Sequence, residues 1–208
     1  ETNKYLCVSE MNEIVIASSN QHKVSEITTE INSIFHKIYS LSDFPNIGEI
    51  KEDGTSVLEN SFIKSRVTFN YTNIPSIADD TALEVDFLNG DPGIYTARYA
   101  GENATYDDNI NKLLNAMTNL PFSERTARFK TIITYVDGKN DFSVEGCLEG
   151  NILTEKQGTS GFGYDPVFFV QDKNISLAEM SLTEKNQISH RAIAIKKFKD
   201  EIKQLLNA

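Results

Sequence analysis

The residues most suited to chemistry are two adjacent carboxylates, Asp79 and Asp80, which follow the short apolar stretch 77–78 and precede Thr81. Neighbouring carboxylates concentrate negative charge, which needs a cation or contact with solvent. Together with Glu52, in the charged loop 41–55, they offer the oxygen ligands that Mg²⁺ prefers. The alternative is a solvated acidic turn at the end of a strand, and the pair alone leaves both interpretations open.

A second candidate is the polar turn formed by Ser18, Ser19 and Asn20, which joins a β-branched run to a helical pattern and is followed by Lys23. Backbone amides at a helix start, together with the helix dipole, favour an anion, and Lys23 would add a full positive charge. The glycines and the Lys-Ser/Thr ending of a Walker loop are missing. The turn is therefore a candidate phosphate site or an ordinary strand-to-helix connection.

Two further candidates lie in the second half of the chain. Residues 158–166 contain three glycines among aromatic residues, so the backbone could approach a ligand closely while a ring offers a flat face. Lys185, His190 and Arg191 lie within seven residues of one another near a helix start, where they could bind phosphate. The plainer alternatives are an aromatic structural turn and a helix cap.

The elements that must position these residues follow from hydrophobic periodicity. The pattern predicts strands at 13–18, at 77–78 and 83–85 on either side of the acidic pair, at 127–135, and at 142–148 after an Asp137-Gly138 hairpin. It predicts helices at 24–35, from the capping box 56–59 with Leu58, Phe62 and Phe69 on the buried face, at 109–117, from the capping box 181–184, and from Ser189 onward.

Composition narrows the class of protein. The 208 residues are 39% hydrophobic and 24% charged, as in globular proteins, and suffice for one α/β domain over 1–208, with 1–12 as an amino-terminal extension. The net charge of -10 argues against nucleic acid and anionic membranes as partners. No signal peptide or membrane-spanning run is found, so we expect a cytoplasmic protein with free thiols at Cys7 and Cys147.

Taken together, these motifs resemble the inosine triphosphate pyrophosphatases, the Ham1-like family. The similar segments come in the family's order, and they are Ser18-Ser19-Asn20-Gln21-His22-Lys23, residues 78–86, residues 90–101, Gly161-Phe162-Gly163-Tyr164-Asp165-Pro166 and Ser189-His190-Arg191. The resemblance implies an elongated α/β fold, a two-lobed mixed-sheet domain with a central substrate cleft. It also implies a homodimer and a Mg²⁺-dependent hydrolase.

The implied reaction is cleavage of the noncanonical purine nucleoside triphosphates ITP, dITP and XTP to the monophosphate and pyrophosphate, which cleanses the nucleotide pool. The resemblance places metal on Glu52 and Asp80, with Asp80 or Asp79 orienting or deprotonating water. The residues it implies for substrate binding are Ser18, Ser19, Asn20, Lys23, Lys64, Thr81, Phe162, Gly163, Tyr164, Asp165, Lys185, His190 and Arg191.

The implied specificity has a physical basis. Hypoxanthine and xanthine carry an acceptor oxygen at position 6, where adenine carries a donor amine, so a site built of donors leaves adenine unpaired. The sequence departs from the family pattern at three places, because Ser19 and Ala82 replace glycines and Lys156-Gln157-Gly158 stands in place of the usual Pro-Arg-Gly.

Two alternatives belong to other classes. A Maf-type nucleotide pyrophosphatase is the nearest rival enzyme, and the Phe162 loop and the Ser189-His190-Arg191 segment speak against it. A nucleotide-binding protein that has lost catalysis is the other, and the presence of Lys23, Glu52 and Asp80 disfavours it.

Overall fold

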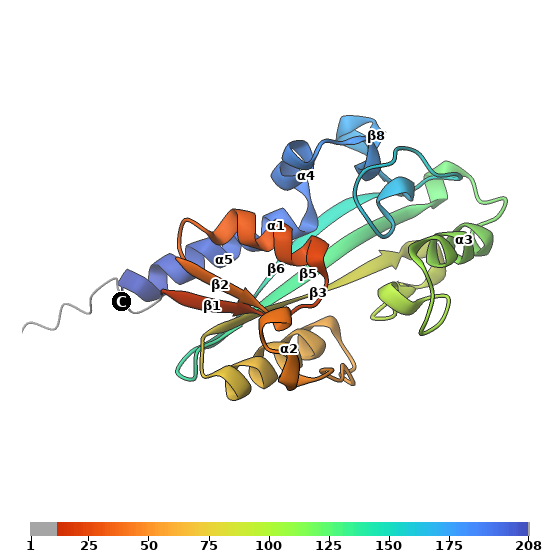
Figure 1. The fold of residues 1–208 in the computed structure, drawn as a ribbon. Helices are drawn as coiled ribbons and strands as arrows, with labels where there is room; N and C mark the ends of the chain where they lie inside the picture. The colour runs from red at the N-terminus through yellow and green to blue at the C-terminus, as the bar shows by residue number, and fades with distance from the viewer. Residues whose placement is uncertain (1–11, 208) are drawn as a thin grey trace, which may run out of the picture. The chain divides into compact units, whose positions relative to one another are not determined.

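The computed structural model describes residues 12–207, so all but the last residue of the predicted extension at 1–12 lies outside the described part (Figure 1). The chain divides into two compact units, which are described separately. The first comprises Glu1–Asp80, Ile132–Val144 and Ile195–Ala208, and the second comprises Thr81–Thr131 and Glu145–Ala194. Among residues 12–207, no helix has the length and apolar character needed to cross a bilayer.

The first unit begins with three strands, in the order β2-β1-β3. Strands β1 (Glu13–Ile16) and β2 (Lys37–Ser40) pair in parallel, and β1 also pairs in parallel with the start of β3 (Ser76–Val85). The connections are α1 (Gln21–Ile31) and α2 (Val57–Thr72). In Figure 1, α1 and α5 lie on one face of these strands and α2 lies on the other.

This connectivity creates a switch point at the carboxyl end of β1. The chain leaves β1 through α1 to reach β2 on one side, and it returns through α2 to β3 on the other side. In open α/β sheets such a divergence leaves a crevice outside the carboxyl ends of the strands, where ligands bind. The turn at 18–20 begins there, which explains why polar residues follow the buried run 14–17.

The second unit is dominated by antiparallel pairs. Strand β3 pairs with β4 (Pro92–Gly93), β6 (Asp141–Ile152) pairs with β7 (Phe168–Val170), and β7 pairs with β8 (Ile175–Ser176). Strand β5 (Thr126–Val136) is the neighbour of β6 in the sheet, which confirms the predicted hairpin. Parallel and antiparallel pairs together confirm a mixed-sheet α/β fold.

The remaining helices match the predicted positions. They are α3 (Tyr106–Ala116), α4 (Leu182–Ile188) and α5 (His190–Asn207). Helix α3 starts three residues earlier than predicted, because Thr105 and Asp108 form a capping box that the periodicity did not reveal. Short 3₁₀ turns occupy Leu41–Asp43, Pro45–Ile47, Asp86–Leu88, Thr96–Arg98, Phe122–Glu124, Asp165–Val167, Gln171–Lys173 and Leu177–Glu179.

Helix α2 differs from its predicted orientation. Leu58 is 40% exposed and Phe62 is half-buried, so the predicted apolar face is not the buried one. The inward face is polar and consists of Asn60, Ser61, Lys64, Ser65 and Thr68. The hydroxyls of the two serines lie 3.0 and 2.9 Å from the hydroxyl of Thr134 on β5, so small polar side chains let the helix approach the sheet closely.

The predicted helix start of α2 is also only half correct. Ser56 is the N-cap and accepts from the amide of Glu59 at 3.1 Å. The carboxylate of Glu59 does not return to Ser56, because it accepts instead from the amide and the hydroxyl of Thr55. The capping box at 181–184, by contrast, is complete.

A buried arginine ties the second unit together. The Arg125 side chain is 2% exposed, and its guanidinium donates to the carbonyl oxygens of Met117 (2.7 Å), Ile152 (2.7 Å) and Leu153 (2.8 Å). These carbonyls lie at the end of α3 and of β6. One planar donor thus satisfies three buried acceptors next to the main apolar cluster, which includes Leu113, Phe129, Phe168 and Leu177.

We expect Arg125→Met to lower the free energy of unfolding by about 3 kcal/mol or more, because it removes the guanidinium donor from three buried carbonyls. The matched control is Arg128→Met, since Arg128 pairs at the surface with Asp86 and Glu149, and such pairs contribute about 1 kcal/mol or less. Urea unfolding of both variants measures the difference. Equal losses would contradict the role given to Arg125.

Candidate active site

The acidic pair, which we expected at the end of a strand, lies within a continuous strand, and this separates the two aspartates. Asp79 and Asp80 lie inside β3 rather than at its end. Successive side chains of a strand point to opposite faces, so the two carboxylates meet different helices. Asp79 is fully buried and pairs with Lys23 of α1 at 3.1 Å, whereas Asp80 pairs with Lys64 of α2 at 3.2 Å.

Lys64 joins two carboxylates on the α2 side. Its ammonium lies 3.0 Å from a Glu52 carboxylate oxygen and 3.2 Å from one of Asp80, and the side chain is only 10% exposed. Burial opposes its charge, but the charges of Asp80, Glu52 and Asp79 outweigh burial and raise the pKa of Lys64. The lysine therefore stays protonated, and one cation holds two acids from distant parts of the chain.

The environment of Asp80 is unfavourable for its negative charge. Burial raises the pKa of Asp80 above its ordinary value, although Lys64 and Lys23 pull it down, and the nearby Glu52 and Asp79 add to the rise. An additional cation beside Asp80 would stabilise the ionised carboxylate and offset the repulsion from the neighbouring acids.

The loop that carries Glu52 is fixed by residues that sequence reasoning missed. The Asn60 side chain on the buried face of α2 accepts from the amide of Gly54 at 2.9 Å. A Cβ at Gly54 would come within 2.7 Å of that same Asn60 oxygen, so glycine is needed for the close approach. The sequence carries little signal for this contact, because a loop glycine shortly before a helical asparagine is a common pattern.

The turn after β1 is organised by Asn20. Its side chain oxygen accepts from the amides of His22 (3.0 Å) and Lys23 (3.4 Å) at the start of α1, and the amide of Asn20 donates to the Ser18 hydroxyl. These two helix amides are therefore already capped within the chain. Ser19 is exposed and, among the described residues, the non-glycine residues with positive φ are four asparagines, so Ser19 needs no glycine-like conformation.

The donor set fits a hard divalent cation that also binds substrate. Within residues 12–207 no group of three or more His, Cys, Asp or Glu side chains is placed to hold a metal by itself. Glu52 and Asp80 already share one cation, the Lys64 ammonium. Mg²⁺ is commonly held by one or two carboxylates, with water and phosphate oxygens completing its shell.

A second group of predicted residues gathers around Phe162 in the second unit. The Lys185 ammonium lies 4.7 Å from the centre of the Phe162 ring, and the Arg191 guanidinium carbon lies 5.7 Å from it. Asp165 holds the arrangement, since one carboxylate oxygen accepts from Lys185 at 2.8 Å and from the Phe162 amide at 2.9 Å. Both Asp165 and Lys185 are buried. We call these four residues the Phe162 cluster.

Backbone geometry explains a glycine in this loop. Gly161 has a φ of +77°, and a Cβ there would come within 2.1 Å of the Asp165 carboxylate. Any larger residue would push Asp165 away from Lys185. Gly163 also has a positive φ, but a Cβ there would meet nothing within 4 Å.

The side chain of Tyr164 packs into the apolar core of the second unit. It is 4% exposed and belongs to the apolar cluster, and its hydroxyl donates to the carbonyl of Thr96 at 3.0 Å. The Thr96 hydroxyl in turn accepts from the Leu83 amide and donates to the Gly93 carbonyl. Tyr164 thus anchors the loop to the 90–101 segment, to which sequence reasoning gave no role.

His190 and Arg191 are buried at the start of α5. The His190 ring stacks on Phe129 with centres 4.6 Å apart, and Arg191 donates to the hydroxyl of Thr81 at 3.3 Å. A Cβ at Gly146 on β6 would lie 1.9 Å from the His190 carbonyl, so glycine permits this contact. Among the predicted residues of the second unit, the structure thus brings Arg191 to both Thr81 and Phe162.

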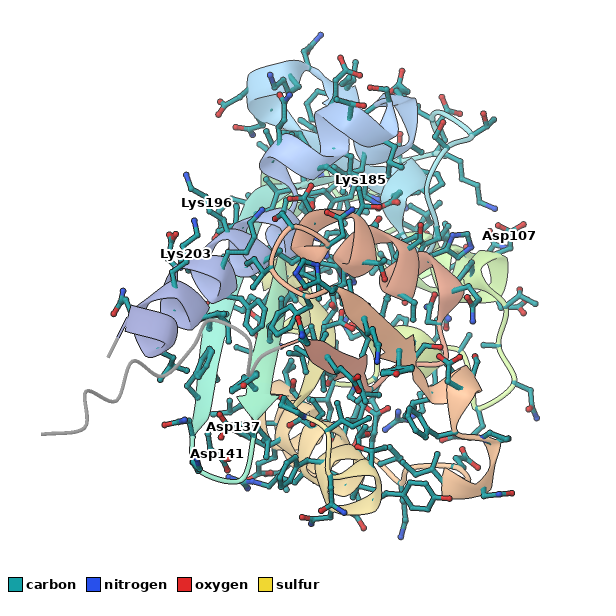
Figure 2. The ribbon with its side chains drawn as sticks, turned by 60° about the vertical axis from the view of Figure 1, so that its left-hand side comes forward. Asp107, Asp137, Asp141, Lys185, Lys196 and Lys203 are labelled. Carbon is teal, nitrogen blue, oxygen red and sulfur yellow. The ribbon has the colours of Figure 1, made fainter. Side chains whose placement is uncertain are left out.

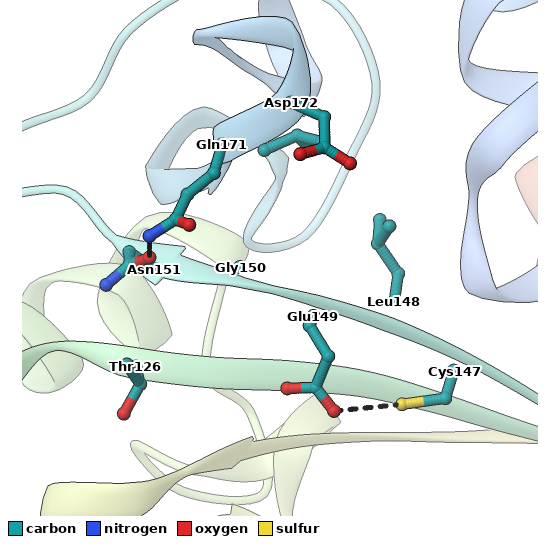
Figure 3. A pocket seen from close by; sticks show the side chains of 9 residues that line it. Thr126, Cys147, Leu148, Glu149, Gly150, Asn151, Gln171 and Asp172 are labelled. Carbon is teal, nitrogen blue, oxygen red and sulfur yellow. Dashed lines mark hydrogen bonds between the residues drawn. The ribbon is translucent and has the colours of Figure 1, made fainter.

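A separate pocket of roughly 340 Å³ lies along β6 in the second unit (Figure 3). It is lined by Thr126, Cys147, Leu148, Glu149, Gly150, Asn151, Val170, Gln171 and Asp172, none of which was predicted as a site residue. The Cys147 thiol is free, as predicted, and burial together with Glu149 raises its pKa. Cys7 lies outside the described residues.

Comparison with known proteins shows the family to which the chain belongs. Residues 14–201 match the model of the Ham1 family. A dITP/XTP pyrophosphatase from Thermoanaerobacter pseudethanolicus is 47% identical over 91% of this chain and 96% of its own length. One from Vibrio parahaemolyticus is 46% identical over 89% and 94%.

Solved structures show the same fold. The Ham1 protein of Staphylococcus aureus has a TM-score of 0.83 at 38% identity, covering 92% of this chain and 98% of that one. A HAM1 protein from Coxiella burnetii has a TM-score of 0.85 at 34% identity, covering 93% and 100%. With its family model matched over most of its length and relatives of this identity, the chain belongs to the Ham1 family.

Proposed function

We propose that this protein hydrolyses ITP, dITP and XTP to the monophosphate and pyrophosphate with the help of Mg²⁺. The observation that carries the proposal is the Glu52–Lys64–Asp80 arrangement, where two acids from distant segments meet at one lysine. The similarity to proteins named dITP/XTP pyrophosphatase supports the choice of substrates. The family match is to Ham1, which argues against the Maf-type alternative.

In this proposal the first unit handles the triphosphate. Lys23 and Lys64 neutralise phosphate oxygens. The turn after β1 also binds the triphosphate, through Ser18, Ser19 and Asn20. Glu52 and Asp80 would hold Mg²⁺, which would supply Lewis-acid polarisation of the phosphate oxygens and activation of water. Asp79, fully buried against Lys23, fixes that lysine, and Asp80 is left to orient the attacking water.

The Phe162 cluster supplies base recognition. Phe162 offers a stacking surface, and the two side chains beside it, Lys185 and Arg191, can only donate hydrogen bonds. A 6-oxo purine accepts from such donors, whereas the 6-amino group of adenine would leave a buried donor unpaired. His190, Gly163 and Thr81 complete the set of binding residues in this proposal.

Assembly and location stay predictions. The family resemblance implies a homodimer, the net charge of -10 argues against nucleic acid and anionic membranes as partners, and we propose that the protein is cytoplasmic. The remaining alternative is a nucleotide-binding protein that has lost catalysis. Measured turnover of ITP or XTP would exclude it.

We expect ITP and XTP to be hydrolysed at least about 100-fold more efficiently than ATP, because the donors near Phe162 mismatch adenine. Separate assays of pyrophosphate and orthophosphate across a panel of nucleoside triphosphates, with and without Mg²⁺, measure this. Orthophosphate as the first product, or equal rates with ATP, would refute the proposal.

Asp80→Asn should lower kcat by about 100-fold or more, since it removes an anionic metal ligand that also orients water. Calorimetric titration should still detect ITP binding. Asp86→Asn is the matched control, because Asp86 follows the same strand but pairs with Arg128. An Asp80→Asn enzyme with normal turnover would remove Asp80 from the mechanism.

The pH dependence follows from the raised pKa of Asp80. A metal ligand must be ionised, so the affinity of the substrate-free protein for Mg²⁺, measured by calorimetric titration across a pH series, should fall as the pH drops through that pKa. Lys64→Met removes a charge that holds the pKa of Asp80 down, so the acid limb of this profile should move to higher pH. Lys64→Arg keeps the charge and should leave the limb in place. A limb that stays unmoved in Lys64→Met would contradict the coupling.

A further inference from the structure

The loop that carries Phe162 depends on contacts from outside itself. Gly158, Gly161 and Gly163 all have positive φ, and glycines add freedom that must be removed when the loop is ordered. The backbone is held by the bond from Ser160 to the Ala178 carbonyl and by Asp165. The Phe162 side chain is half-buried, so its ring orientation depends on its neighbours.

One of these neighbours lies outside every motif of the sequence. Tyr106, the first residue of α3, packs against Phe162 with ring centres 6.2 Å apart and planes inclined by 42°. This separation is within the range of favourable aromatic pairs. Tyr106 is nevertheless 45% exposed, so the ring is not part of the apolar core.

A second contact joins the same two segments. Asp107, the next residue of α3, pairs with Lys156 at 2.7 Å, and Lys156 lies just before the glycine-rich loop. Asp107 is 73% exposed at the start of the helix, where Figure 2 labels it. Such an exposed pair contributes little stability. Like the contact between Tyr106 and Phe162, however, it joins the start of α3 to the Phe162 loop.

We infer that Tyr106 is a positioning residue that fixes the ring of Phe162 for base stacking. The inference rests on the proposed function in taking Phe162 as the stacking ring. Lys185 and Arg191 lie beside the same ring, so Tyr106 adds the aromatic contact that these cations cannot supply. A ring held in place before binding loses less freedom when a base stacks on it.

Removal of the Tyr106 ring should leave the fold intact. The start of α3 is capped by Thr105 and Asp108, whose side chains each accept from the other's backbone amide, and Tyr106 takes no part in this box. Alanine is also a better helix former than tyrosine. Tyr106→Ala therefore tests positioning rather than folding.

The first measurement needs no substrate. The chain contains no tryptophan, so the indole of a Phe162→Trp variant is a unique fluorescent reporter. Adding Tyr106→Ala should increase quenching of its emission by acrylamide, and adding Tyr106→Phe should not, because the ring is kept. Unchanged quenching in Tyr106→Ala would overturn the inference.

The second measurement uses the native Phe162. Tyr106→Ala should raise KM for ITP about threefold to tenfold, the equivalent of one aromatic pair, with kcat unchanged. Tyr106→Phe should restore KM. The control is Tyr71→Ala, which removes a tyrosine of similar exposure (49%) from α2. An equal rise in that control, or a fall in kcat alone, would overturn the inference.

The two measurements also separate this inference from the proposed function. If quenching responds as expected but the parent enzyme releases no pyrophosphate from ITP or XTP, Tyr106 still positions Phe162 and the proposed reaction is wrong. If the parent enzyme is active and quenching does not respond, the reaction stands and the role of Tyr106 is wrong.

Discussion

The ion pairs of Lys64 are the constraint on which the first unit depends. Burial of an ammonium group destabilises the fold unless carboxylates pair with it. Glu52 from a loop and Asp80 from a strand form these pairs with Lys64. To bring Lys64 to this position, α2 turns a polar face toward the sheet and leaves Leu58 exposed. The helix thus gives up apolar burial so that two acids and a lysine can meet.

The second unit solves a different problem, that of holding a glycine-rich loop in one conformation. Asp165 binds both the amide of Phe162 and the ammonium of Lys185, and Tyr164 anchors the loop to Thr96. Arg125 stabilises the neighbouring core by satisfying three carbonyls. Positive charge is gathered here by Lys185 and Arg191, which explains how a protein with a net charge of -10 can be suited to an anionic substrate.

Much of the fold follows from local sequence patterns. The β-branched run before Ser18, the hairpin at Asp137 and the capping box at Ser181 are short-range signals, and each appears where it was predicted. The orientation of α2 was not predicted correctly. The spacing of Leu58, Phe62 and Phe69 defines an apolar face of the helix, but it does not determine whether the sheet packs against that face. The cap at Thr105 was not predicted, because the four-residue pattern of a capping box is short and often occurs by chance.

The sequence by itself determined the family and the identity of the candidate residues, because ordered motifs of fixed spacing are specific even when each is weak alone. Only the tertiary structure decided how Asp79 and Asp80 differ. Continuous strand geometry sends them to opposite faces, where one meets Lys23 and the other meets Lys64. It also revealed Asn60, Thr96 and Tyr106, whose contacts depend on how the chain folds back on itself and so leave no periodic trace in the sequence.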